Sequence, residues 1–541
     1  MTQQQIAFTA PHKTATEAGM FILQQGGTAT EAMVAAAATI SVVYPHMNSI
    51  GGDSFWLIDK LGSAQPIAID ACGASASNLT PYGLLDTIPE RGGLSAITQA
   101  GTIRGWQQAL ASDENAKLPL SVILSPAIDA AKNGFAVTES LQAGGEKLFS
   151  VIERNAAFKA LYEPNGSPLK QGETFTNPAL ANVFEYLAKH GLSAFYEGEL
   201  AESFAKDLED AGSPLTLEDI SSTQASIVSP LKAQLQGVDC YNLPAPTQGI
   251  HSLVILALVD RLKDKAGEDI DWLHLIVEAT KQSFHLRPQL WADPNNVSPL
   301  YDKVLSEQTL SELAGNISMA KAEAWPFNAK PGDTVWMAAR DQHGQMVSFI
   351  QSIYWEFGSG IVMRDGGFTW NNRGVSFSLN NEHINALAPN QKPAHTLNPA
   401  FARFHDGRRL AYGTMGGEGQ PQTQAKVFSD YTWRNQSIEQ AVAAPRWLLG
   451  RTWGDTSTNL KVEQSLADSL GTELDRLKHK WQAVADCNEM MGHAGAILDK
   501  PNVDIDSDTE GANATKTRSV EAASDPRSDG SALVATISVT Q

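Results

Sequence analysis

The hydrophobic pattern of this chain changes at residue 333, and that change limits the folds open to it. Residues 118–313 carry apolar side chains at helical spacing, which predicts helices that cover another layer. After residue 333 the chain reads instead as short strands separated by turn residues. The polar residues 316–332, with two prolines, predict an exposed connector between the two parts. The sequence therefore predicts a layered molecule of helices and strands.

The first strands after the connector predict a β-hairpin. Two strand-like runs, residues 334–340 and 345–353, flank an Asp-Gln-His-Gly turn signature. This turn places Thr334 opposite Gln351 or Ser352, depending on a register of one residue. Ser352 would then offer a hydroxyl to Thr334, although serine and threonine on neighbouring strands are commonly ordinary cross-strand pairs. Further strands are predicted at residues 368–379, 399–404, 409–412 and 532–539.

Charge and missing motifs exclude several classes of function. Sixty acidic and 40 basic residues give a net charge of −20, which opposes binding to nucleic acid or an anionic membrane. No stretch approaches the roughly 18 apolar residues of a membrane helix, and the first ten residues do not resemble a secretory signal, so a cytoplasmic location is expected. Three widely separated cysteines are expected to be buried thiols. Neither a metal nor another cofactor is predicted, because no metal-binding or phosphate-binding motif occurs.

Short blocks along nearly the whole chain resemble, in order, those of the gamma-glutamyltranspeptidase family. The resemblance begins at residues 14–19 and 44–53. The later blocks include Asn133-Gly134-Phe135, Pro246-Thr247-Gln248-Gly249-Ile250, Asp333-Thr334, Phe357-Gly358-Ser359-Gly360-Ile361, Gly416-Gly417 and Ser524-Asp525-Pro526-Arg527. This resemblance implies an α+β fold, the four-layer αββα sandwich of N-terminal nucleophile hydrolases. It also implies an inactive precursor that cuts itself into two subunits.

The family pattern assigns roles to residues around the cleavage point. Cleavage after Asp333 implies a large subunit of residues 1–333 and a small subunit of residues 334–541, with Thr334 as nucleophile. An N-terminal threonine supplies its own α-amine as general base, with an ordinary pKa of roughly 7.7–8.0. The resemblance makes Ser352 a supporting hydroxyl. It also makes Gly416 and Gly417 the donors to the oxyanion, although a glycine pair is more often a turn.

The sequence departs from the family where members that cleave glutathione bind an α-ammonium group. An Asn-Asn pair ending at Asn372 is followed by Arg373 rather than an acid. Tyr354 stands where the family has Asn, and His395 and Thr396 replace a Ser-Ser pair. Because arginine repels an ammonium and attracts a carboxylate, the expected substrate is an acid without an α-amine. The predicted substrate-binding residues are Asn372, Arg373, His395 and Thr396.

These departures resemble the branch of the family that contains oxamate amidohydrolase, which implies hydrolysis of a small acidic amide to an acid and ammonia. Alternatives within the family are a γ-glutamyl hydrolase or transpeptidase and a β-lactam side-chain acylase. An uncleaved homologue that only binds a ligand is an alternative of another class. Arg373 also fits a structural ion pair, and His395 a packed core histidine. The expected partners are the substrate and the two subunits of one chain, with further homo-oligomerisation left open.

Overall fold

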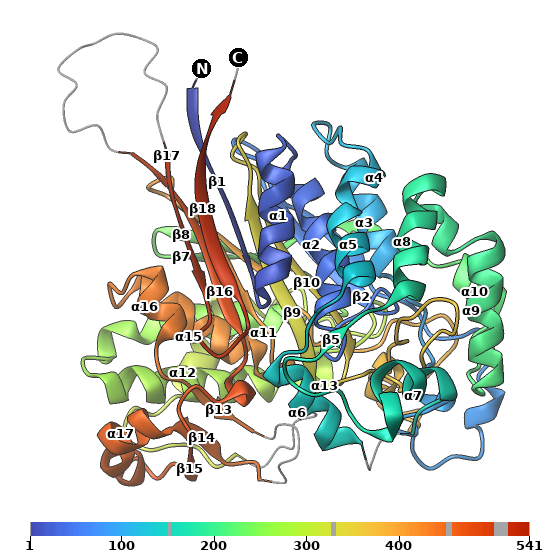
Figure 1. Cartoon of the computed structure of the whole chain (residues 1–541). Coiled ribbons are helices and arrows are strands. Elements are labelled where there is room, and N and C mark those ends of the chain that lie inside the picture. Colours follow the sequence, from blue (N-terminus) through green and yellow to red (C-terminus); the bar gives the residue numbers. More distant parts are fainter. Residues whose placement is uncertain (1, 150–152, 326–331, 451–456, 503–517, 540–541) are drawn as a thin grey trace.

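Two antiparallel sheets form the centre of the molecule (Figure 1). The computed structural model describes residues 2–149, 153–325, 332–450, 457–502 and 518–539. The first sheet has seven strands, in the order β18 (Ser531–Val539), β1 (Thr2–Ala10), β9 (Asp333–Arg340), β10 (Met346–Tyr354), β2 (Asp53–Asp59), β3 (Ile67–Ala71) and β6 (Ser226–Val228). The second has six strands, in the order β17 (Arg518–Ser524), β16 (Ala494–Pro501), β12 (Arg409–Thr414), β11 (Ala400–Phe404), β8 (Val238–Asn242) and β7 (Leu231–Leu235).

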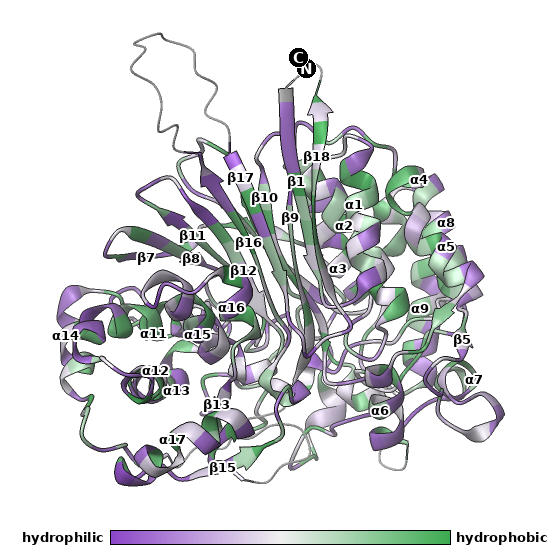
Figure 2. Ribbon diagram, turned by 60° about the vertical axis from the view of Figure 1, so that its left-hand side comes forward, coloured by the Kyte–Doolittle hydropathy of each residue, from purple (hydrophilic) through white to green (hydrophobic). Residues whose placement is uncertain are grey.

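Helices cover the outer face of each sheet, and Figure 2 shows the sheets stacked between them. The seven-stranded sheet is covered chiefly by α1 (Lys13–Gln24), α2 (Ala29–Val43) and α3 (Thr102–Ala111). The six-stranded sheet is covered by α11 (Gly249–Leu262), α15 (Gln420–Thr432) and α16 (Ile438–Ala443), and α12 (Asp269–Phe284) packs against α11 and α15. Separate apolar cores lie under each helix layer and a third lies between the sheets. Three cores between four layers are the packing of an αββα sandwich.

The sequence of α2 accounts for its burial. Every residue of α2 is buried, and the helix is apolar on nearly all sides, as expected of a helix enclosed by other elements. It begins at a capping box, in which the Thr28 side chain accepts from the backbone N–H of Glu31 and the Glu31 side chain accepts from the backbone N–H of Thr28. This helix packs on β9 and β10, so it supports the hairpin that carries Thr334.

The alternation along β9 directs Thr334 toward the second sheet. Val335 and Met337 contribute to the core under the helices, whereas Trp336 and Ala338 contribute to the core between the sheets. Because successive side chains of a strand point to opposite faces, Thr334 shares the inner face with Trp336. The site is therefore built between the two sheets, at one end of the sandwich.

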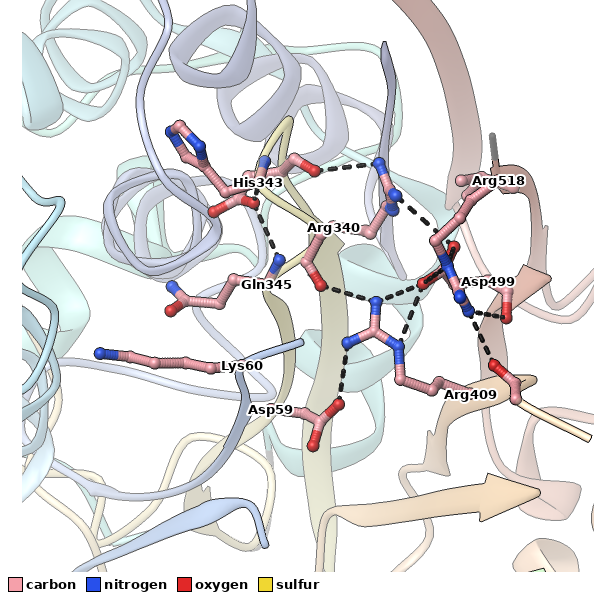
Figure 3. A network of polar contacts seen from close by, with 12 residues as sticks. Asp59, Lys60, Arg340, His343, Gln345, Arg409, Asp499 and Arg518 are labelled. Atoms are coloured by element: carbon pink, nitrogen blue, oxygen red, sulfur yellow. Dashed lines mark hydrogen bonds and ion pairs between the residues drawn. The ribbon is translucent and has the colours of Figure 1, made fainter. Parts of the chain in front are cut away.

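Salt bridges join the two sheets near the turn of the β9–β10 hairpin, at the end away from Thr334 (Figure 3). The carboxylate of Asp499 on β16 binds Arg340, Arg409 and Arg518, and Arg518 Nε lies 2.9 Å from its Oδ2. Arg409 also pairs with Asp59 of β2, 3.0 Å away. Burial alone would raise the pKa of Asp499, but Arg409 and Arg340 outweigh it and hold that pKa below its ordinary value. These contacts fix the two sheets to each other.

Most of the predicted strands are confirmed, and two expectations are wrong. The hairpin is present as β9 and β10, and the strands predicted at residues 399–404, 409–412 and 532–539 are β11, β12 and β18. Residues 368–379 form no long strand; they contain bridges, turns and the short helix η6 (Arg373–Ser376). Cys487 is exposed, unlike the two buried cysteines. Part of the predicted connector, residues 326–331, lies outside the described residues.

Among the residues that the structure describes, no helix combines the length and the apolar character required to span a membrane.

Candidate active site

Thr334 is fully buried at the start of β9, opposite an irregularity in the hairpin. Val335 pairs with Gln351, whereas Asp333 pairs with Tyr354, so the register shifts between these two pairs. Thr334 therefore faces the bulge that contains Ser352 rather than Gln351. A bulge of this kind redirects the side chains of a strand and is common beside active sites.

The bulge is held in place by Ser352 and its neighbours. Ser352 Oγ accepts a hydrogen bond from the backbone N–H of Tyr354, with a distance of 2.8 Å. On the other side, Ser352 pairs with Asp53 of β2. Gly52 lies so close that a Cβ there would be 2.1 Å from the Ser352 carbonyl oxygen. Tyr354 follows with a left-handed φ of 84°, which is uncommon for a residue with a side chain.

The loop after β12 brings the predicted glycine pair to the strand that carries Thr334. Gly416 and Gly417 have φ values of 119° and 54°, a left-handed backbone that favours glycine. A Cβ on Gly417 would lie 3.0 Å from both the backbone N and the carbonyl oxygen of Gly332. Gly332 is only two residues before Thr334, so the pair lies at the predicted cleavage point and not across the molecule.

A buried polar network fixes this glycine loop. Gln248 Nε2 donates to the carbonyl oxygens of Gly417 and Thr396, at 2.8 and 2.6 Å. Arg287 donates to Gln248 Oε1 over 3.2 Å and forms an ion pair with Glu418. Sequence reasoning gave these residues no role. The signal available for Gln248 was its place in the block Pro246-Thr247-Gln248-Gly249-Ile250, which resembles the family.

Arg373 is buried in the neighbouring loop with part of its guanidinium unpaired. The side chain is 1% exposed, its NH2 donates to Thr396 Oγ1 over 2.9 Å, and its Cζ lies 3.7 Å from the centroid of the Tyr354 ring. Its NH1 has no hydrogen-bond partner, and no carboxylate of the described residues forms an ion pair with it. Burial lowers the pKa of Arg373, against the opposing charges of Tyr354 and Asp53. A buried cation of this kind is costly unless an anion joins it.

The other predicted substrate-binding residues hold loops. Asn372 Oδ1 accepts from the Trp355 N–H over 3.2 Å, and its Nδ2 donates to the Glu90 carbonyl over 3.0 Å. His395 Nδ1 accepts from the Leu397 N–H over 3.3 Å. The structure thus brings Arg373 and Thr396 together and engages Asn372 and His395 in contacts with the surrounding backbone.

His395 also contacts Asp53, which sequence reasoning did not single out. Because His395 Nδ1 accepts from the backbone, its Nε2 carries the proton and donates to Asp53 Oδ2 over 3.0 Å. Burial holds the pKa of His395 well below its ordinary value, so the ring is neutral. Burial also raises the pKa of Asp53 to about 7, against the opposing effects of the Gly73 N–H and of Arg373.

The described part of the chain contains two groups of three side chains whose potential metal-ligand atoms lie within 4.8 Å of one another. In the first, Asp53, Cys72 and His395, the imidazole nitrogens already contact Asp53 and the backbone. In the second, His274 Nδ1 lies 2.8 Å from His479 Nε2, and the carboxylate of Glu278 pairs with Lys281 at 2.6 Å. The imidazole and carboxylate groups named here therefore already have partners within the protein.

The four-layer sandwich, with a buried threonine at the start of an inner strand, defines the class of N-terminal nucleophile hydrolases. The chain belongs to the gamma-glutamyltranspeptidase family, whose sequence profile matches residues 15–535. It is 44% identical to the oxamate amidohydrolase proenzyme of Klebsiella pneumoniae subsp. pneumoniae, over 97% of each chain. It is 27% identical to the glutathione hydrolase proenzyme of Escherichia coli, over 91% of this chain and 88% of that one.

A solved structure agrees with this assignment. The cephalosporin acylase from Bacillus halodurans superimposes with a TM-score of 0.86 and 27% sequence identity, over 98% of this chain and 96% of that one. The expected α+β sandwich is thereby confirmed. The protein is an N-terminal threonine hydrolase of this family, made as a proenzyme that processes itself into a large and a small subunit.

Proposed function

We propose that this proenzyme matures into an amidohydrolase that acts on a small acidic amide such as oxamate and releases ammonia. The environment of Arg373 is the main support for an acidic substrate. Among the described residues, its buried guanidinium has an NH1 without a hydrogen-bond partner and no carboxylate as an ion-pair partner. A substrate carboxylate would supply both the charge and the acceptor. The 44% identity to a relative named oxamate amidohydrolase proenzyme supports the same choice.

The surroundings of Arg373 favour an acid without an amine. Its planar guanidinium suits the two oxygens of a carboxylate and repels an ammonium group. Thr396 Oγ1 already accepts from NH2, so it fixes the orientation in which NH1 meets a ligand. A γ-glutamyl substrate carries an α-ammonium group, which this cation disfavours.

Maturation would begin with the Thr334 hydroxyl. Its oxygen attacks the carbonyl carbon of Asp333, and the acyl group moves from the nitrogen to the oxygen of Thr334. Water then hydrolyses this ester, which leaves a carboxylate on Asp333 and a free α-amine on Thr334. Cleavage thereby creates the general base that the mature enzyme uses.

Turnover would repeat the same chemistry on the substrate. The Thr334 amine takes the proton of the hydroxyl, and the oxygen attacks the amide carbon. Backbone N–H groups of Gly416 and Gly417 would stabilise the oxyanion, a contribution of roughly 10²–10³ in rate for one donor. The amine returns the proton to the leaving nitrogen, so ammonia departs. Water then hydrolyses the acyl-threonine ester to the free acid.

The position of the cut is compatible with a stable heterodimer. We place the large subunit at residues 1–333 and the small subunit at residues 334–541. Each sheet contains strands from both segments. The first sheet combines β1, β2, β3 and β6 of the large segment with β9, β10 and β18 of the small one, and in the second β7 and β8 pair onto strands of the small segment. The two products would therefore share both sheets and the core between them.

Ammonia release from a panel of amides tests the proposal. Processed protein would be assayed with oxamate, with glutamine as a γ-glutamyl amide, with an uncharged small amide, and for release of a cephalosporin side chain. We expect the highest kcat/KM for oxamate. A higher value for the γ-glutamyl amide or for the cephalosporin would overturn the assignment in favour of that substrate class.

A further inference from the structure

Tyr354 lies beside Arg373 and the strand of the nucleophile, and the proposed reaction does not use its side chain. It is the last residue of β10, it is 2% exposed, and it pairs across the bulge with Asp333. Its backbone is left-handed and is held there by the hydrogen bond from its N–H to Ser352 Oγ. A bulky residue in this conformation is strained and persists only where its surroundings fix it.

The Tyr354 ring contacts the Arg373 cation and also approaches the segment that precedes the nucleophile. The Arg373 Cζ is 3.7 Å from the ring centroid. Ring atoms Cε2 and Cδ2 lie 3.4 and 3.5 Å from the point where a Cβ on Gly332 would sit. The Gly417 Cα lies 3.2 Å from the same point. One aromatic ring is therefore next to the guanidinium and to the junction of Gly332 with the glycine loop.

We propose that this ring limits the length of the acyl group to acids whose carboxylate is attached directly to the amide carbon or is one carbon away. The inference rests on the proposed function, in which the carboxylate binds Arg373 and the amide carbon meets Thr334. The ring is in van der Waals contact with the guanidinium and lies beside the backbone at Gly332, so it occupies space next to both ends of the proposed substrate. A longer chain between the two groups would need the volume that the ring occupies.

The left-handed backbone of Tyr354 determines which substitutions can remove the ring without disturbing the main chain. Asn and Gly both adopt left-handed φ values readily, so Tyr354→Asn and Tyr354→Gly remove the ring without new backbone strain. Tyr354→Phe keeps the ring and removes only the hydroxyl, which makes it the matched control.

The experiment measures kcat/KM for oxamate, malonamate, succinamate and glutaramate, in which zero to three methylene groups separate the carboxylate from the amide. For wild-type protein we expect at least a tenfold loss from malonamate to succinamate. In Tyr354→Asn and Tyr354→Gly the ratio of succinamate to oxamate should rise at least tenfold, whereas Tyr354→Phe should keep the wild-type ratio. Because every substrate carries the carboxylate, the ratio is insensitive to weaker binding at Arg373.

The possible failures can be told apart. Wild-type protein that hydrolyses succinamate and glutaramate within tenfold of oxamate would overturn the length limit, whatever the variants do. An unchanged ratio in both ring-free variants, or the same shift in Tyr354→Phe, would also overturn it while leaving the proposed function intact. Processed wild-type protein that hydrolyses none of the four acids would overturn the proposed function and this inference together.

Discussion

Replacing Arg373 by alanine should remove the preference for acidic amides. The guanidinium is buried, and in the proposed complex it would be the charged partner of the substrate carboxylate. Truncating one partner of a buried, hydrogen-bonded charge pair costs about 2–5 kcal/mol. At about 1.4 kcal/mol per factor of ten, this predicts a fall in kcat/KM for oxamate of roughly 30-fold to several thousand-fold.

Protein stability should respond differently from activity in this variant. No carboxylate of the described residues forms an ion pair with Arg373, so its removal leaves no such acid unpaired. Removing a buried charge that lacks an ion-pair partner need not destabilise a protein. We expect little loss of melting temperature and normal self-cleavage. Arg409→Ala is the matched control, because Arg409 pairs with Asp59 and Asp499 and its loss should lower the melting temperature.

The assay compares ammonia release from oxamate with release from an uncharged amide of similar size, for wild-type protein and Arg373→Ala. We expect a large loss on oxamate and little change on the uncharged amide, whose binding does not use the guanidinium. Equal losses on both substrates would assign Arg373 a structural role. Unchanged rates on both would place it outside the substrate site.

Two further predictions concern the glycine loop and the buried ion network. Gly417→Ala keeps the backbone N–H but should displace it, because φ is 54° and the new Cβ would lie 3.0 Å from Gly332. This displacement should reduce kcat by up to about 100-fold, the effect of losing one oxyanion donor; wild-type-like kcat would contradict the oxyanion role. The lowered pKa of Asp499 adds stability above its unfolded pKa of about 3.9, and this is lost as the pH falls through the folded value. Asp499→Asn should therefore lower the melting temperature strongly at pH 7 and less near pH 3, and an equal loss at both would contradict the assignment.

The hairpin could be predicted because it depends on local pattern. A turn signature between two strand-like runs specifies which strands pair and limits the register to one residue. The bulge that places Ser352 rather than Gln351 opposite Thr334 could not be predicted. It depends on Gly52 and Asp53, which lie some 300 residues earlier in the chain and pack against the hairpin in the folded molecule.

The contacts that hold the predicted substrate-binding residues in place also join residues far apart in the sequence. Arg373 meets Thr396 across a loop, and Gln248 links Thr396 to Gly417. Nothing in the spacing of these residues indicates their proximity. Substitution at family positions led to the prediction of Arg373, His395 and Thr396 as substrate-binding residues, but it indicated neither their neighbours nor the contact of the His395 ring with Asp53.

One predicted strand did not form and several strands were not predicted, β1 among them. Strand β1 was not predicted because Thr2–Ala10 opens with polar residues, yet it lies between β18 and β9, where tertiary pairing decides its conformation. Residues 368–379 are apolar enough to resemble a strand, but they form irregular structure that carries Arg373 between the sheets. Prediction of secondary structure from local propensity fails here, in a segment that contributes a residue to the candidate site.

The most direct test of the central claim is the intact mass and N-terminal sequence of the mature chains. Wild-type protein should separate under denaturing conditions into residues 1–333 and residues 334–541, with the smaller chain beginning Thr-Val-Trp. Thr334→Ala should remain one uncut chain without amidase activity. An active wild-type protein that is a single uncut chain, or whose smaller chain begins at another residue, would contradict the assignment of Thr334 as the nucleophile.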